Sequence, residues 1–304
     1  MANIQKLLKD YLNYLEIEKN RSRKTQANYE RQLKAFIEFG KIKSEKDIDL
    51  DLVRDFRLHL ARQNLKKISQ SYYVIAIRNF LKYLNKRDLD VLSPDKIELP
   101  KVVRRQIEII EYKDLERLLN APAGNDLRSL RDRAILETLF STGLRISELC
   151  ALNRHFDIDR GEITVRGKGE KLRLVFFSEH AKKAVKNYLE KRTDAEPALF
   201  VSLSKVQKTK DNKIKEPKVI GRIIPRAVQR LVNFYARQAG IPENVTPHQL
   251  RHQFATDLLI GGADLRSVQE LLGHSSVSTT QIYTHLTNKE LHDVHKAFHG
   301  RRRR

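Results

Sequence analysis

The segment LSPDKIELPKVVRRQIEII, residues 92–110, most constrains the fold, because it separates two regions of different pattern. It contains two prolines and little helical periodicity, as interdomain linkers do. We therefore expect an N-terminal domain at residues 1–92, a linker at 93–110 and a C-terminal domain at 111–304. A chain of 304 residues is long enough for both domains to have buried cores.

Before the linker, apolar residues recur three and four positions apart, as in LLKDYLNYL and YYVIAIRNFLKYL. This spacing gathers them on one face of a helix. It predicts helices over about 3–19, 22–39, 49–63 and 69–84, started by Ser22 or Thr25, Asp49 and Ser69. The N-terminal domain should therefore be all helical, with lysine and arginine on its outer faces.

After the linker the pattern is mixed. Helices are expected near 113–120, 127–140, 179–191 and 225–238, and again from His248 onward. The runs EITVR and LRLVFF on either side of GKGEK predict a β-hairpin. The lysine-rich stretch 202–221 has few large apolar residues and predicts a long mobile loop.

The charge of the chain indicates a polyanionic partner. Lysine and arginine total 59 against 38 aspartate and glutamate, a formal net charge of +21. Nucleic acid is the first candidate, with a merely basic surface as the alternative. A single cysteine, Cys150, excludes an intramolecular disulfide framework and fits a reducing cytosol. Since no stretch approaches 18 apolar residues, we expect no membrane partner and a cytoplasmic protein. A nucleic-acid partner would make it nucleoid-associated.

Six polar side chains stand at the ends or turns of predicted elements. They are Arg145 after STG, Lys168 in the hairpin turn, His248 and Arg251 at the start of VTPHQLRHQFATDLL, His274 after ELLG, and Tyr283 in TTQIYTH. Taken singly, each has an ordinary structural explanation. Together they are what phosphoryl transfer without a metal needs: arginine forks for phosphate oxygens, a lysine acid and a tyrosine nucleophile.

The motifs TGLRISEL, GKG, TPHQLRHQFATDLL and LLGHSSVSTTQIYTH, in this order and at these separations, resemble the catalytic boxes of Xer-type tyrosine site-specific recombinases. They resemble those of phage integrases more distantly. The resemblance covers nearly the whole chain. It implies a mainly α fold, with a helical, SAM-like core-binding domain that grips DNA and a mostly α catalytic domain carrying a small β-sheet or hairpin.

By this resemblance, Tyr283 attacks a DNA phosphodiester and forms a 3′-phosphotyrosyl enzyme with a free 5′-hydroxyl. Arg145 and Arg251 hold the non-bridging oxygens, and His274 donates a further hydrogen bond to them. The first turn of the helix beginning near His248 is then expected to present its basic side chains to a phosphate, where free backbone N–H groups also favour an anion.

The remaining roles follow in the same way. Lys168 protonates the leaving 5′ oxygen, and His248 acts as acid, base or orienting partner near the tyrosine. Glu148, three residues after Arg145, is expected to orient that arginine from the same helix. His252 receives no catalytic role and is taken as structural.

The implied partners are two double-stranded DNA sites and three further protomers, with no cofactor, metal or ATP. A paralogous recombinase or a DNA translocase as an added partner stays open. The Xer resemblance suggests resolution of chromosome dimers at a dif-like site before cell division. An integrase or resolvase of a mobile element or plasmid would use the same residues.

Three other function classes compete with this interpretation. A metalloenzyme would use His248 and His252 as in H-E-x-x-H, but Gln249 replaces the glutamate base. A non-catalytic DNA-binding regulator would gain nothing obvious from Tyr283 and two arginines. A type IB topoisomerase shares the tyrosine chemistry but relaxes supercoils without pairing two sites.

Two segments depart from the Xer pattern. The stretch 202–221 is longer and more basic than its usual counterpart; we favour slack chain over added DNA contacts. The tail ends in four arginines, Arg301 to Arg304, which fit a disordered basic tail, docking on a neighbouring protomer or contact with DNA. His292, His295 and His299 have helical spacing, but no cysteine or carboxylate is arranged to complete a zinc site.

Overall fold

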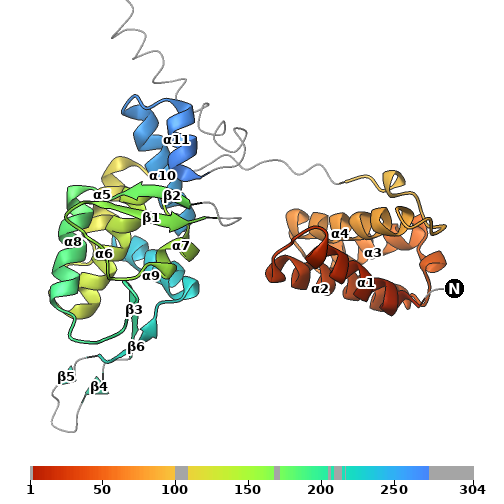
Figure 1. Cartoon of the computed structure of the whole chain (residues 1–304), viewed down its shortest axis with the longest axis horizontal. Helices are drawn as coiled ribbons and strands as arrows, with labels where there is room; N and C mark the ends of the chain where they lie inside the picture. The colour runs from red at the N-terminus through yellow and green to blue at the C-terminus, as the bar shows by residue number, and fades with distance from the viewer. Residues whose placement is uncertain are drawn as a thin grey trace, which may run out of the picture. The chain divides into compact units, whose positions relative to one another are not determined.

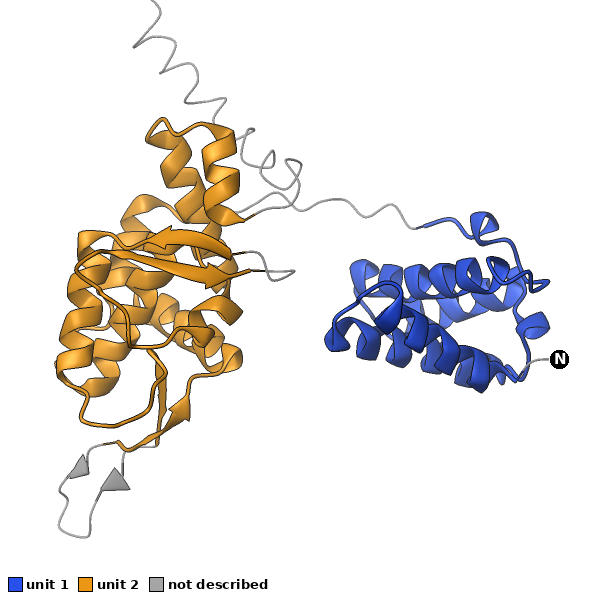
Figure 2. Cartoon of the chain, viewed as in Figure 1, with its two compact units in different colours: residues 1–105 blue, residues 106–304 orange. Residues whose placement is uncertain are grey.

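The computed structural model describes residues 3–99, 109–167, 172–204, 207–208, 214–215 and 217–273. The chain divides into two compact units, Met1–Arg105 and Gln106–Arg304 (Figure 2). Each has its own cluster of buried apolar side chains. Among the helices described, none combines the length and the apolar character that crossing a bilayer requires.

The first unit is a helical bundle. It contains α1 (Ile4–Ile17), α2 (Arg23–Gly40), the 3₁₀ turn η1 (Glu45–Asp47), α3 (Leu50–Arg62) and α4 (Lys67–Asn85) (Figure 1). Tyr11, Phe36, Phe56 and Phe80 are all buried in its centre, and Tyr11 lies 5.3 Å from Phe80 between ring centroids. Burying such rings dominates the stability of a small helical core.

Side-chain caps set the starts of three of these helices. Asn3, Ser22 and Asp49 each accept a hydrogen bond from a backbone N–H of the first turn, which would otherwise lack a partner. The expected start at Ser69 is wrong: α4 begins two residues earlier, at Lys67, without a side-chain cap. The 3₁₀ turn η2 (Pro94–Lys96) follows, and Ile97 is buried in the same core.

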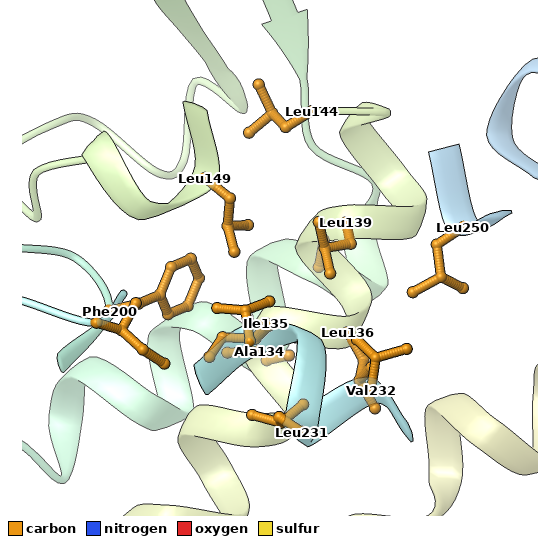
Figure 3. Close-up of a cluster of buried hydrophobic side chains, with 14 of the residues drawn as sticks. Ala134, Ile135, Leu136, Leu139, Leu144, Leu149, Phe200, Leu231, Val232 and Leu250 are labelled. Atoms are coloured by element: carbon orange, nitrogen blue, oxygen red, sulfur yellow. The ribbon is translucent and has the colours of Figure 1, made fainter. Parts of the chain in front are cut away.

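In the second unit, α6 (Leu127–Thr142) is the central helix. It packs against α8 (Glu179–Glu190), α9 (Pro225–Gln238) and α10 (Pro247–Ile260), while α5 (Tyr112–Asn120) and the short α7 (Ile146–Ala151) lie beside it. Figure 3 shows Ile135, Leu136 and Leu139 of α6 among Leu231, Val232 and Leu250 of α9 and α10. Because α6 is buried on several faces, the other helices of the unit pack around it.

The expected hairpin is present as β1 (Glu162–Arg166) and β2 (Leu172–Phe176), which pair antiparallel with Thr164 opposite Leu174. The last helix described, α11 (Leu265–Leu272), packs on α10 and β2 (Figure 1). As expected, the α10 side chains Phe254, Ala255, Leu258 and Leu259 form the apolar contact there, against Val268 and Leu272.

The stretch 202–221 differs from the expected loop. Its ends pair antiparallel as β3 (Val201–Leu203) and β6 (Val219–Arg222), and β4 (Gln207–Lys208) pairs with β5 (Ile214–Lys215). Val201 is buried and Val219 packs against the core. The short apolar runs at the two ends therefore anchor a hairpin, and the lysine-rich composition between them concealed it.

Candidate active site

Arg145 stands at a sharp break between two helices. Helix α6 ends at Gly143, whose φ of 58° is in the left-handed region that glycine adopts at helix ends. Leu144 and Leu149, on either side of Arg145, are both buried in the core (Figure 3). The core therefore fixes the backbone at Arg145, which is the residue preceding α7.

Glu148 binds Arg145 twice. Its Oε2 accepts the Arg145 backbone N–H at 2.8 Å, and its Oε1 accepts Arg145 Nη1 at 2.9 Å. Burial alone would raise the pKa of the Glu148 carboxyl, but hydrogen bonds from arginine and from the backbone outweigh it and lower the pKa to about 2. Glu148 is thus an anion that holds the Arg145 guanidinium, the contact expected from their spacing.

Arg173 is a functional candidate that the sequence reasoning missed. From β2 it donates Nη1 and Nη2 to the two carboxylate oxygens of Glu148, at 2.9 and 2.7 Å, and Nε to the Leu271 carbonyl at 3.0 Å. Its side chain is 10% exposed. A weak signal was present: Arg173 alternates with Leu172 and Leu174, so one face of the strand had to differ from the other.

Helix α10 contributes His248 and Arg251. Thr246 and Gln249 form a capping box and Pro247 occupies the first turn, which fixes where the helix begins. Contrary to the expected display toward a phosphate, Arg251 is only 2% exposed. Its guanidinium donates to the carbonyls of Gly143 and Leu272, so it joins the end of α6 to the end of α11.

His248 retains solvent access and lies beside His252, with ring centroids 4.2 Å apart. Partial burial, followed by the positive charges of Arg251 and Arg145, lowers the pKa of His248. The lowered pKa favours the neutral imidazole, which is the form that can accept a proton.

Three arginines converge on one short stretch of backbone. Arg173 binds the carbonyl of Leu271, Arg251 that of Leu272, and Arg145 that of Gly273 at 3.1 Å. Carbonyls at the end of a helix have no partner within it and carry partial negative charge, so guanidinium groups suit them. The three basic side chains come from β2, α10 and the start of α7.

The other candidate residues are not placed. Lys168, His274 and Tyr283 lie outside the described residues, as do His292, His295, His299 and the tail. In the sequence, His274 directly follows the Gly273 carbonyl that Arg145 binds.

The cluster formed by Arg145, Arg173, Arg251, His248 and Glu148 carries three permanent positive charges against one carboxylate. Arg145 is the most accessible of the three arginines: its side chain is 32% exposed, compared with 10% for that of Arg173, and Arg251 is buried. Such an arrangement favours an anion with several oxygens, since guanidinium forks bind phosphate in fixed geometry.

Models of two protein families match the chain. Residues 108–290 match "Phage integrase family", and residues 8–88 match "Phage integrase, N-terminal SAM-like domain". The tyrosine recombinase XerC of Thermodesulfovibrio yellowstonii is 36% identical over 301 residues, which cover 98% of both chains. The chain belongs to the phage integrase family, among the Xer tyrosine recombinases. The tyrosine recombinase XerD of Halalkalibacterium halodurans is 34% identical to this recombinase, and the match covers 99% of this chain and 100% of XerD.

Solved structures share the fold. The XerA recombinase is 29% identical over 99% of both chains, with a TM-score of 0.52. The XerH recombinase bound to a palindromic difH substrate matches 90% of this chain and 80% of its own, at 23% identity and a TM-score of 0.69. The Tn1549 transposon integrase matches 98% and 100%, at 19% identity and a TM-score of 0.71. The mainly α recombinase fold expected from the sequence is confirmed.

Proposed function

We propose that this recombinase cuts and rejoins duplex DNA at specific sites, through a 3′-phosphotyrosyl intermediate on Tyr283. The observation that carries the proposal is the convergence of Arg145 and Arg251 on the adjacent Gly273 and Leu272 carbonyls. Two guanidinium groups, far apart in the sequence, thus meet at the two residues that precede His274. This is the arrangement that a transferring phosphoryl group requires.

The arginines supply the charge stabilisation in this scheme. Arg145 and Arg251 bind the non-bridging oxygens of the scissile phosphate, and His274 donates a further hydrogen bond. Phosphate oxygens are anionic and accept hydrogen bonds from guanidinium more strongly than backbone carbonyls do. DNA therefore competes well for the donors that carbonyls now hold, while Glu148 keeps Arg145 in place.

The protons are handled by neighbouring side chains. The Tyr283 oxygen attacks phosphorus and passes its proton to the neutral His248 imidazole. The bond to the 5′ oxygen breaks, and Lys168 supplies the proton that this oxygen takes up. In the second step a 5′-hydroxyl attacks the phosphotyrosine and passes its proton to Lys168, while Tyr283 leaves and takes back the proton that His248 holds. One ester replaces another, so the bond energy is conserved and neither ATP nor a metal is needed.

Double-stranded DNA is the partner that the charge and the surface favour. Helix α9 carries the exposed Arg226, Arg230 and Arg237, which line a hollow together with Gln229 and Asn233. Exposed basic side chains grouped on one helix supply positive charge for the phosphates of a duplex. Recombination pairs two sites, and in the Xer scheme four protomers assemble on them.

Resolution of chromosome dimers at a dif-like site is the biological role we favour. The support is the Xer assignment over the full chain, together with the difH substrate of the XerH structure. The match to a transposon integrase keeps mobile-element integration as the second candidate, because the same fold and chemistry serve both. A cytoplasmic, nucleoid-associated location follows from either role.

A two-site plasmid tests the function. Supercoiled plasmid with two directly repeated dif-like sites is incubated with the recombinase in EDTA, alongside plasmid with no site. We expect two smaller circles from the first and no relaxation of the second. Relaxation of both plasmids without exchange would instead indicate a topoisomerase, and a requirement for Mg²⁺ or ATP would contradict the proposed chemistry.

A further inference from the structure

Arg173 joins three parts of the active site that the proposed mechanism treats separately. It makes a bidentate ion pair with Glu148, which is 5% exposed, and a hydrogen bond to the Leu271 carbonyl in the last turn of α11. Glu148 in turn holds the guanidinium and the backbone N–H of Arg145. None of the roles proposed for Tyr283, Lys168 and the histidines involves Arg173.

The position of Arg173 in its strand is unusual. The register of the hairpin sets Arg173 opposite Val165, which is 5% exposed, and its neighbour Val175 is 1% exposed. The apolar Leu172, Leu174 and Phe176 are 65%, 42% and 49% exposed. The hairpin therefore points an arginine inward and apolar residues outward, which costs stability unless the arginine has buried partners.

We infer that Arg173 is a positioning residue that fixes Arg145, through Glu148, relative to the end of α11. The inference rests on the proposed function. Without Arg173, Glu148 has one guanidinium partner instead of two and is free to rotate. The Leu271 carbonyl loses its donor at the same time. Arg145 and the backbone that leads into His274 would then no longer keep a fixed separation.

Lysine cannot replace this arginine. A lysine ammonium group is a single point charge on a flexible stem, and it lacks the planar fork that binds both carboxylate oxygens while Nε binds the Leu271 carbonyl. Arg173→Lys thus keeps the charge and removes the geometry. A conservative variant of this kind separates positioning from simple electrostatics.

Arg222 provides the matched control. It is also half-buried, and it donates to the backbone carbonyls of Cys150 and Leu152 and to the Asn153 side chain. It contacts no member of the Arg145 cluster in these interactions. Arg222→Lys therefore reports what the loss of a structural arginine fork does to this unit.

The test compares both variants with wild type on nicked duplexes carrying a dif-like site. The rate of covalent adduct formation is measured at saturating protein, and the affinity of each protein for DNA is measured on the intact duplex. We expect Arg173→Lys to cleave about 100-fold more slowly, as misplacement of a catalytic group does, with affinity unchanged within about twofold. Arg222→Lys should cleave near the wild-type rate. The double variant Arg173→Gln with Glu148→Gln should cleave only slightly more slowly than the slower of the two single variants, because both substitutions remove the same contact.

Hydrogen exchange of α11 in the free protein provides a readout that does not require cleavage. The amides of α11 should exchange faster in Arg173→Lys than in wild type or Arg222→Lys, because the last turn loses a tether. If wild type forms no adduct, the proposed function fails. The exchange rates of the α11 amides then test independently whether Arg173 holds the last turn of α11. Wild-type cleavage by Arg173→Lys, equal losses in both variants, or unchanged α11 exchange would each overturn the inference.

Discussion

At the scale of single residues, the site is built from guanidinium groups that bind more than one partner. Arg145 binds Glu148 and Gly273, and Arg251 binds Gly143 and Leu272. The spacing of Arg145 and Glu148 could be predicted because it is local to one helix. Arg173 could not, since its importance depends on contacts with Glu148 and Leu271, which only the folded chain brings together.

The pH dependence of cleavage should show the lowered pKa of His248. If the neutral imidazole takes the Tyr283 proton, the rate falls when His248 becomes protonated. Partial burial and the charges of Arg251 and Arg145 disfavour that protonation, so the midpoint of the acid limb should lie below the ordinary histidine value of 6.5. Cleavage at subsaturating DNA and protein, measured across pH, checks this, because its rate reports the groups of the free protein. A midpoint at or above 6.5, or the same limb in His248→Gln, would contradict the assignment.

At the scale of elements, the helices follow from local signals, and the less regular pieces do not. Ser22 and Asp49 cap α2 and α3 as expected, because capping involves only neighbouring residues. The β3–β6 pair was missed because its two short strands are separated by a lysine-rich stretch. Strands of this length are defined by their pairing and by burial against the core, which a local pattern does not contain.

Gly143→Ala should weaken the junction between α6 and α7. A residue with a Cβ is strained at φ 58°, and the added methyl would lie inside van der Waals distance of the Phe254 ring. Backbone strain and overpacking together should lower the free energy of unfolding by about 2–4 kcal/mol. Cleavage should fall as well, since the Gly143 carbonyl binds Arg251. Urea denaturation and single-turnover cleavage measure the two effects.

Gly262→Ala is the control for that variant. Gly262 also has a positive φ, 91°, but nothing lies within 4 Å of the added methyl. Gly262→Ala should lower the free energy of unfolding by about 1 kcal/mol and leave the cleavage rate unchanged. Equal destabilisation by the two variants would mean that the contact with Phe254 contributes nothing.

At the scale of the whole molecule, the sequence predicts the kind of partner from the net charge and the domain organisation from the linker. The net charge of +21 predicted a polyanionic partner, and the proline-containing segment 92–110 predicted two domains. The chain does divide into two compact units, and separate family models match residues 8–88 and 108–290. The bounds 1–92, 93–110 and 111–304 stay a prediction, and Ile97 packs with the N-terminal core.

Duplex binding should weaken steeply with salt. Neutralising phosphates releases counterions, so affinity should fall about 10³-fold or more between roughly 50 and 200 mM salt. Arg230→Ala, on the exposed side of α9, should reduce the salt slope by about 1. Arg160→Ala should leave it unchanged, because Arg160 pairs with Glu162 and lines a different hollow with Asp157. Fluorescence anisotropy at several salt concentrations tests this, and equal slopes for all three proteins would remove α9 from the DNA interface.

Trapping the covalent intermediate tests the central claim most directly. Wild type and Tyr283→Phe are incubated in EDTA with nicked duplexes carrying dif-like sites, and the products are run on denaturing gels. Wild type should form a protein–DNA adduct joined to the 3′ side of the break, while Tyr283→Phe should bind the duplex equally well and form none. An adduct that persists in Tyr283→Phe, or one that appears only when Mg²⁺ is added, would contradict the account.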